Sequence, residues 1–100
     1  MSVTVTTAQN VARISLAGEL DFSFQEDLKR AADEALNSPV ERIEIDMAET
    51  SFIDSSVIRA FLKLHEAARR AQRPLKIVNC NSQIREIFEI GGFDQIFDIQ

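Results

Sequence analysis

The sequence has 100 residues, 45% of them hydrophobic, which suits one compact domain with a single core. With 11 Lys and Arg against 16 Asp and Glu, the net charge of −5 repels nucleic acid and anionic membrane surfaces. No apolar stretch approaches the roughly 20 residues that span a bilayer, and the N-terminus has no basic region followed by an apolar run. We therefore expect one domain over residues 1–100, located in the cytoplasm, without a nucleic-acid partner and without membrane insertion.

The first predicted elements form a β-hairpin. Residues 3–6 and 11–16 both alternate apolar with small or polar side chains, and Gln9-Asn10 between them supplies turn chemistry. Ser23 and Glu26 then have the spacing of a capping box, and apolar residues recur at helical spacing from Phe24 to Leu36. An antiparallel hairpin followed by an amphipathic helix is predicted.

In the second half of the chain, predicted strands alternate with a predicted helix. Residues 42–47 alternate with period two, and residues 75–78 form a short apolar run typical of an interior strand. Between them, residues 57–68 carry one apolar helical face, and the segment Asp54-Ser55-Ser56 precedes it. Two strands and a second amphipathic helix are predicted.

A third helix is predicted near the C-terminus. Asn81-Ser82 supplies caps, Ile84, Ile87 and Phe88 supply an apolar stripe, and Gly91-Gly92 supplies a left-handed terminator. Residues 93–99 then suggest a last short strand. The whole order predicts an α/β (α+β) fold, a mixed sheet of four to five strands with three helices mainly on one face.

The segment Asp54-Ser55-Ser56 is placed where first-turn amide groups and the positive end of a helix dipole favour an anion. A phosphate on Ser55 would add roughly −1.5 to −2 charges there without melting the helix. The same residues are also preferred N-caps, so a purely structural role accounts for them equally well.

Three landmarks together resemble the STAS-domain anti-sigma factor antagonists (anti-anti-sigma factors). They are Gly18-Glu19-Leu20-Asp21, Phe52-Ile53-Asp54-Ser55-Ser56 and Ile87-Phe88-Glu89-Ile90-Gly91-Gly92-Phe93, in that order. The resemblance implies a single STAS domain over 1–100 and a partner-switching function. It also implies that the serine after the aspartate, Ser55, is the phosphorylation site, with Ser56 as second choice.

The family's partners follow from the same resemblance. An anti-sigma factor with serine kinase activity binds the unmodified antagonist and phosphorylates it, and a serine phosphatase of the metal-dependent class reverses the modification. The expected partner-binding residues are Asp21, Phe22, Ser23, Asp54, Ser55, Ser56, Val57 and Arg59. Val57 and Arg59 depart from the family pattern, which usually has glycine at both positions.

The alternative is a constitutive STAS subunit of a larger complex, such as an ATP-driven lipid transporter. An enzyme is disfavoured because ten residues of helix separate Ser55 from the single histidine, His65, by about 15 Å. We interpret Asp21, Asp46, Glu49 and Asp54 as solvated acids and Cys80 as a core thiol, so no catalytic residue, metal or cofactor is expected.

Overall fold

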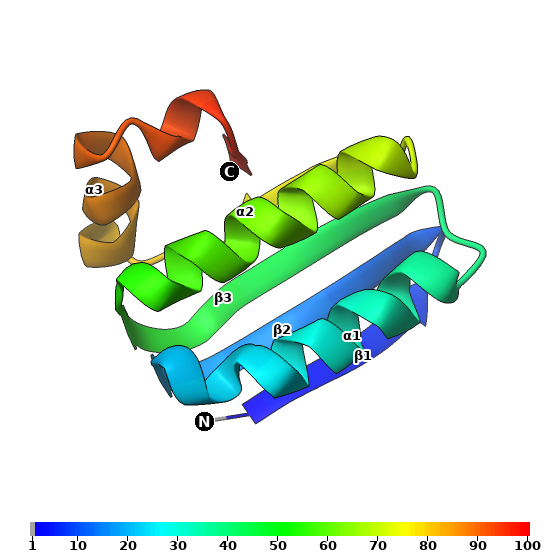
Figure 1. Cartoon of the computed structure of the whole chain (residues 1–100), viewed down its shortest axis with the longest axis horizontal. Helices are drawn as coiled ribbons and strands as arrows, with labels where there is room; N and C mark the ends of the chain where they lie inside the picture. Colours follow the sequence, from blue (N-terminus) through cyan, green and yellow to red (C-terminus); the bar gives the residue numbers. More distant parts are fainter. Residues whose placement is uncertain (1) are drawn as a thin grey trace.

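The computed structural model describes residues 2–100, which form a five-stranded sheet and three α-helices (Figure 1). In chain order the elements are β1 Ser2–Ala8, β2 Val11–Leu20, α1 Gln25–Asn37, β3 Arg42–Ile53, α2 Ser55–Arg70, β4 Leu75–Val78, α3 Ser82–Ile90 and β5 Asp98–Ile99. Two short 3-10 turns, Phe22–Phe24 and Phe93–Gln95, precede α1 and β5.

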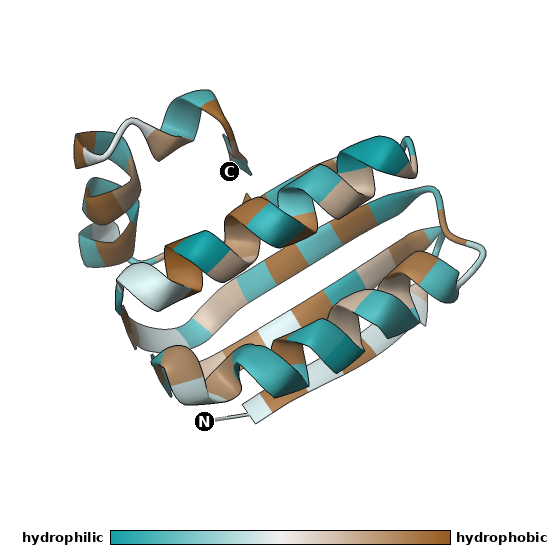
Figure 2. Cartoon of the chain, in the orientation of Figure 1, coloured by the Kyte–Doolittle hydropathy of each residue, from teal (hydrophilic) through white to brown (hydrophobic). Residues whose placement is uncertain are grey.

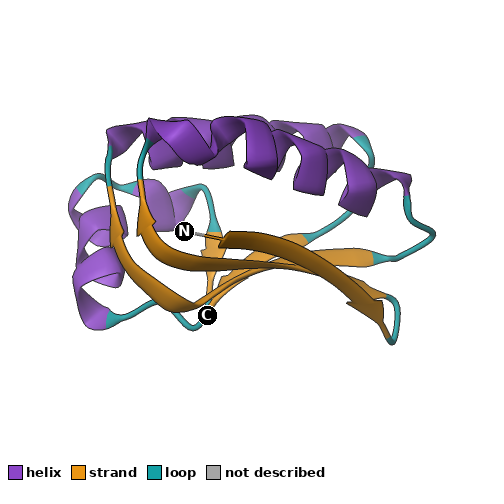
Figure 3. Ribbon diagram, turned by 90° about the horizontal axis from the view of Figure 1, so that it is seen from below, coloured by secondary structure: helices purple, strands orange, loops and turns teal. Residues whose placement is uncertain are grey.

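The sheet has the strand order β1-β2-β3-β4-β5, with β1 antiparallel to β2 and the other neighbours parallel. Helices α1 and α2 lie side by side over one face, and α3 packs at the end of the sheet where the parallel strands finish (Figures 1 and 3). The predicted mixed sheet with its helices mainly on one face is confirmed.

Two strand predictions need correction. Strand β3 continues to Ile53, well past the predicted end at Met47, because it keeps pairing with β2 as far as Leu20. The last strand was predicted over residues 93–99 but consists of Asp98–Ile99 alone. Gly92, with φ of 76°, instead turns the chain into a 3-10 segment before it reaches the sheet.

The hairpin turn between β1 and β2 is formed by the two residues predicted for it. Gln9 and Asn10 have φ values of 54° and 66°, the left-handed conformation that a two-residue hairpin requires at both positions. The turn fixes the register of the β1–β2 pair, which runs without interruption from Ala8 opposite Val11 to Ser2 opposite Ala17.

The core lies between the sheet and its two covering helices. Buried side chains alternate with polar ones along β2 and β3, a pattern visible as colour stripes in Figure 2. The buried cluster includes Ile14, Ile45 and Met47 of the sheet together with Phe61 of α2 and Phe88 of α3.

A bend near the ends of β2 and β3 brings the chain up to the helical layer. Gly18 has φ of 94°, and the register between the two strands shifts on both sides of it. The one buried polar side chain among the described residues, Thr50, donates a 2.8 Å hydrogen bond to the Leu16 carbonyl at this bend. Figure 3 shows the strands curving toward the helices there.

Candidate functional site

Two adjacent strand-to-helix turns form the candidate site. Leu20 and Ile53 are register partners at the ends of the parallel strands β2 and β3, and each is followed directly by an aspartate. Asp21 leads into the 3-10 turn before α1, and Asp54 leads into α2. The structure therefore brings together two turns that are far apart in the sequence.

Asp54 is the N-cap of α2, as the sequence predicts. Its carboxylate accepts a 2.9 Å hydrogen bond from the backbone N–H of Ser56 and a second one from the Ser56 hydroxyl. The Val57 N–H donates to the Asp54 carbonyl at 3.1 Å. These bonds hold the first turn of α2 in a fixed conformation.

Asp21 repeats this arrangement. It accepts a 2.9 Å hydrogen bond from the Ser23 N–H and another from the Ser23 hydroxyl, and these bonds lower the pKa of the Asp21 carboxyl below its ordinary value. The sequence predicted Ser23 as the cap of a capping box with Glu26. That assignment is wrong, because the capping acceptor is Asp21 and the Ser23 side chain serves as a donor to it.

The second residue of each turn points outward and the fourth points into the core. Ser55 and Phe22 are both exposed at equivalent positions, whereas Val57 and Phe24 are both completely buried. Among residues 2–100, the Ser55 hydroxyl has no hydrogen-bond partner, while the half-buried Ser56 hydroxyl is bound to Asp54. The two serines therefore differ in access.

The two residues that depart from the family pattern differ in their exposure. The Val57 side chain is fully buried in the core, so the prediction that it contacts a partner does not fit its position. Arg59 is exposed, and it follows Ser55 by four residues, which places both on the same face of α2. Of the two residues, only Arg59 changes the surface.

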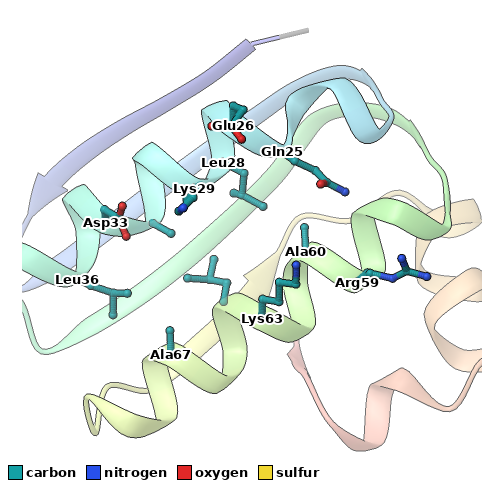
Figure 4. A pocket seen from close by; sticks show the side chains of 12 residues that line it. Gln25, Glu26, Leu28, Lys29, Asp33, Leu36, Arg59, Ala60, Lys63 and Ala67 are labelled. Atoms are coloured by element: carbon teal, nitrogen blue, oxygen red, sulfur yellow. The ribbon is translucent and has the colours of Figure 1, made fainter.

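A groove of about 460 Å³ runs between α1 and α2 and includes Arg59 at its edge (Figure 4). Its floor is formed by apolar side chains and its rim by charged ones. The lining residues are Gln25, Glu26, Leu28, Lys29, Ala32, Asp33, Leu36, Arg59, Ala60, Lys63, Leu64 and Ala67. The candidate site thus adjoins a concave surface.

Exposed apolar side chains gather at the same end of the sheet. Phe22 is 71% exposed and Phe52 53% exposed, in the turn before α1 and at the end of β3. Ile90, near the end of α3, is 79% exposed, and Ile87 is partly exposed although its spacing predicted a core position. The short α3 buries only Ile84 and Phe88, and helical periodicity alone could not show how narrow this buried stripe is.

The remaining candidate residues lie elsewhere. His65 is half-buried and meets Phe97 edge-on, with ring centroids 5.8 Å apart. Burial raises the pKa of the half-buried Cys80 thiol, whose sulfur lies 3.8 Å from that of Met47. Asp46 bonds to Arg13 and Asn79, and no group of three or more His, Cys, Asp or Glu side chains within residues 2–100 is placed to hold a metal ion.

Comparison with known families agrees with this geometry. A family model described as "Mlab, STAS domain" matches residues 3–99, so the chain belongs to the STAS domain family. A STAS-domain containing protein of Pseudomonas aeruginosa (strain UCBPP-PA14) is 28% identical over 86 residues, covering 86% of this chain and 84% of the relative. An anti-sigma-B factor antagonist of Listeria monocytogenes is 26% identical over 87 residues, covering 87% and 76%.

Solved structures share the fold. An anti-sigma factor antagonist from Mycobacterium paratuberculosis aligns with a TM-score of 0.85 and 18% identity, over 98% of this chain and 83% of that one. The Bacillus cell fate determinant SpoIIAA in its phosphorylated form aligns with a TM-score of 0.75 and 20% identity, over 99% and 91%. The predicted resemblance to STAS-domain anti-sigma factor antagonists is confirmed.

No helix within residues 2–100 is both long enough and apolar enough to cross a bilayer.

Proposed function

We propose that this protein is a cytoplasmic anti-sigma factor antagonist whose binding is controlled by phosphorylation of Ser55. With Ser55 unmodified it binds an anti-sigma factor that has serine kinase activity, and with Ser55 phosphorylated it releases that partner. The observation that carries the proposal is the exposed Ser55 hydroxyl at the first position of α2, held in place by the Asp54 cap. The relatives named as anti-sigma factor antagonists support it.

Access favours Ser55 over Ser56 as the phosphate acceptor. A kinase must reach the hydroxyl oxygen, and the Ser56 hydroxyl is half-buried and donates its proton to Asp54. Modification of Ser56 would also remove the hydrogen bond from its hydroxyl to Asp54 and place a phosphate beside that carboxylate, whereas modification of Ser55 leaves both hydrogen bonds to Asp54 intact.

The surroundings of Ser55 can accommodate a phosphate. The group would lie at the positive end of the α2 dipole, which stabilises an anion. Arg59, one helical turn further along and without an ion-pair partner within residues 2–100, is placed to form a charge-assisted contact with it. Phosphorylation would therefore change the charge of the surface while the helix remains folded.

The docking face consists of the exposed parts of the two turns. Asp21, Phe22 and Ser23 lie beside Asp54, Ser55 and Ser56, with Arg59 on the adjoining helix face. The exposed Phe22 ring is suited to anchor a partner, since buried aromatic side chains contribute strongly to interfaces. A phosphate beside that anchor would have to lose its water on binding, at a cost of several kcal/mol, so the partner dissociates.

Reversal of the switch requires a second protein. A serine phosphatase of the metal-dependent class would remove the phosphate and return the antagonist to its binding form. The protein itself supplies the substrate serine and a binding surface in this scheme, and its partners perform the chemistry.

A kinase assay on the wild type and on two serine variants tests the proposal. The purified protein, incubated with ATP and the kinase-type anti-sigma factor of its own organism, should gain one phosphate on Ser55 by fragment mass spectrometry. The Ser56→Ala variant, a matched control in the same turn, should still be modified, and the Ser55→Ala variant should not. Modification of Ser55→Ala to the wild-type extent, or no modification of the wild type, would reject the proposal.

A second candidate function is a constitutive STAS subunit of a larger complex, such as an ATP-driven lipid transporter. It is favoured by Arg59, which gives α2 a charged surface where the antagonists that the sequence resembles usually have glycine. In this case the Ser55→Asp variant should assemble with its partners as the wild type does. Loss of assembly in Ser55→Asp, with retention in Ser55→Ala, would exclude the constitutive subunit.

A further inference from the structure

We infer that the free edge of β1 is a self-association surface, through which two copies of this chain pair to form one continuous sheet. This inference does not rest on the proposed function, because β1 contains none of the residues of the two turns. In the described residues β1 pairs with β2 alone, so its other edge is open. An open edge presents unpaired N–H and C=O groups to another strand.

The two edges of the sheet differ in how well they are protected. At the far edge, β5 has only two residues, and one of them is the charged Asp98. A short edge strand and a charged side chain both discourage pairing with another strand. Strand β1 has seven residues, none of them charged and none proline, and five are β-branched. Its pairing with β2 has no bulge that would twist the edge away.

The turn between β1 and β2 determines which residues face the open edge. In a two-residue hairpin the residues next to the turn, Ala8 and Val11, form a hydrogen-bonded pair, and such pairs alternate along the strands. Thr6 and Thr4 therefore direct their N–H and C=O groups to β2. Val3, Val5 and Thr7 direct theirs outward.

The outward-facing residues are self-complementary. An antiparallel pairing centred on Val5 places Val5 opposite Val5 of the second copy and Val3 opposite its Thr7, so every outward-facing residue of the strand gains a partner. On the uncovered face of the sheet, Thr4 comes opposite Thr6 of the second copy, a pair that can share a hydrogen bond. No like charges meet at this edge.

The same geometry limits the assembly to two copies. A twofold axis at Val5 uses each β1 edge once, and the opposite edge is too short to continue the sheet. The half-buried side chains of Val3 and Val5, which already pack against the core, would gain cover at the join. The turns that contain Ser55 and Phe22 follow β2 and β3 and lie outside the join.

A charge-swap experiment tests this register. Thr4 and Thr6 are exposed, so the double variants Thr4→Lys/Thr6→Lys and Thr4→Glu/Thr6→Glu should fold, as checked by circular dichroism. By sedimentation equilibrium the wild type should form dimers in a concentration-dependent way. Each double variant should remain monomeric, because like charges then oppose each other across the axis, and an equimolar mixture of the two should dimerise again.

Three results would overturn the inference. They are a wild type that stays monomeric at its highest soluble concentration, dimers that persist in both double variants, and a mixture that fails to associate although the wild type dimerises.

A second variant covers the case in which the double variants do not fold. Thr7→Pro removes one outward N–H without touching the ladder to β2, and it should abolish dimers while the monomer stays folded; dimers at the wild-type level would reject the inference.

Discussion

The turns after β2 and β3 share one backbone arrangement but differ at the residue that points outward. Both begin with a capping aspartate, both use a serine two residues later as donor, and both bury the residue after that serine. The outward position holds Phe22 in one turn and Ser55 in the other. The comparison shows that the buried and capping positions maintain the site, while the outward positions are free to carry its function.

Substitutions at buried and exposed phenylalanines of one turn test this division most strongly. Phe24→Ala should lower the free energy of unfolding by about 3–5 kcal/mol, because the ring is completely buried. Phe22→Ala, two residues away, should change it by no more than about 0.5 kcal/mol. Urea denaturation measures both, and similar losses for the two variants would contradict the structural assignment.

Removal of the α2 cap should have the next largest effect. Asp54→Ala should cost about 1 kcal/mol, because the Ser56 N–H and hydroxyl lose their acceptor. Asp54→Asn is the matched control, since asparagine caps a helix about as well as aspartate. Thermal or urea unfolding would show the difference, and an equal loss in both variants would mean that charge rather than capping is responsible.

The turn that begins at Asp21 can also be tested by pH. The Asp21 carboxyl has a pKa below its ordinary value of about 3.9, mainly because the Ser23 hydroxyl donates to it. Its contribution to stability is thus fully present above that ordinary value and is lost as the pH falls through the lower folded pKa. NMR titration of the Asp21 carboxyl should give this low midpoint, and Ser23→Ala should raise it; an unchanged midpoint in Ser23→Ala would contradict the assigned cause.

The smallest expected effect concerns Arg59 in the phosphorylated protein. A contact between the Ser55 phosphate and Arg59 at the i,i+4 spacing should stabilise the protein by about 0.2–0.5 kcal/mol. Arg59→Ala should remove this gain and raise the second pKa of the phosphate. A pH titration followed by 31P NMR measures that pKa. Lys63→Ala, one turn further along α2, is the control, and equal shifts in the two variants would show that the contact is not specific.

Much of the fold was predictable because its signals are local. The Gln9-Asn10 turn, the amphipathic faces of α1 and α2, and the Asn81 cap of α3 depend on residues close in sequence, and each was found where the pattern predicted it. The length of β3 was not predictable, because its last residues are held by pairing with β2 across the bend at Gly18.

The candidate site was predictable in part. The sequence placed Ser55 at the start of a helix, and the expected docking face grouped the turn at Asp21 with it. How closely the turns of Asp21 and Asp54 lie side by side depends on strand register, which the sequence does not show. Helical spacing put Val57 on the apolar face of α2, while the partner-binding prediction also included it. Its complete burial agrees with the first prediction and not with the second. The different access of Ser55 and Ser56 depends on their exposure and on the hydrogen bond from the Ser56 hydroxyl to Asp54, and composition reveals neither.

The affinity of the protein for its kinase-type anti-sigma factor, measured by calorimetry before and after complete phosphorylation of Ser55, tests the central claim most directly. We expect the unmodified protein to bind and the phosphorylated protein to bind at least a hundredfold more weakly, which corresponds to about 2.7 kcal/mol. Treatment with a metal-dependent serine phosphatase should restore binding. Equal affinity of the two forms would contradict the account and favour the constitutive subunit.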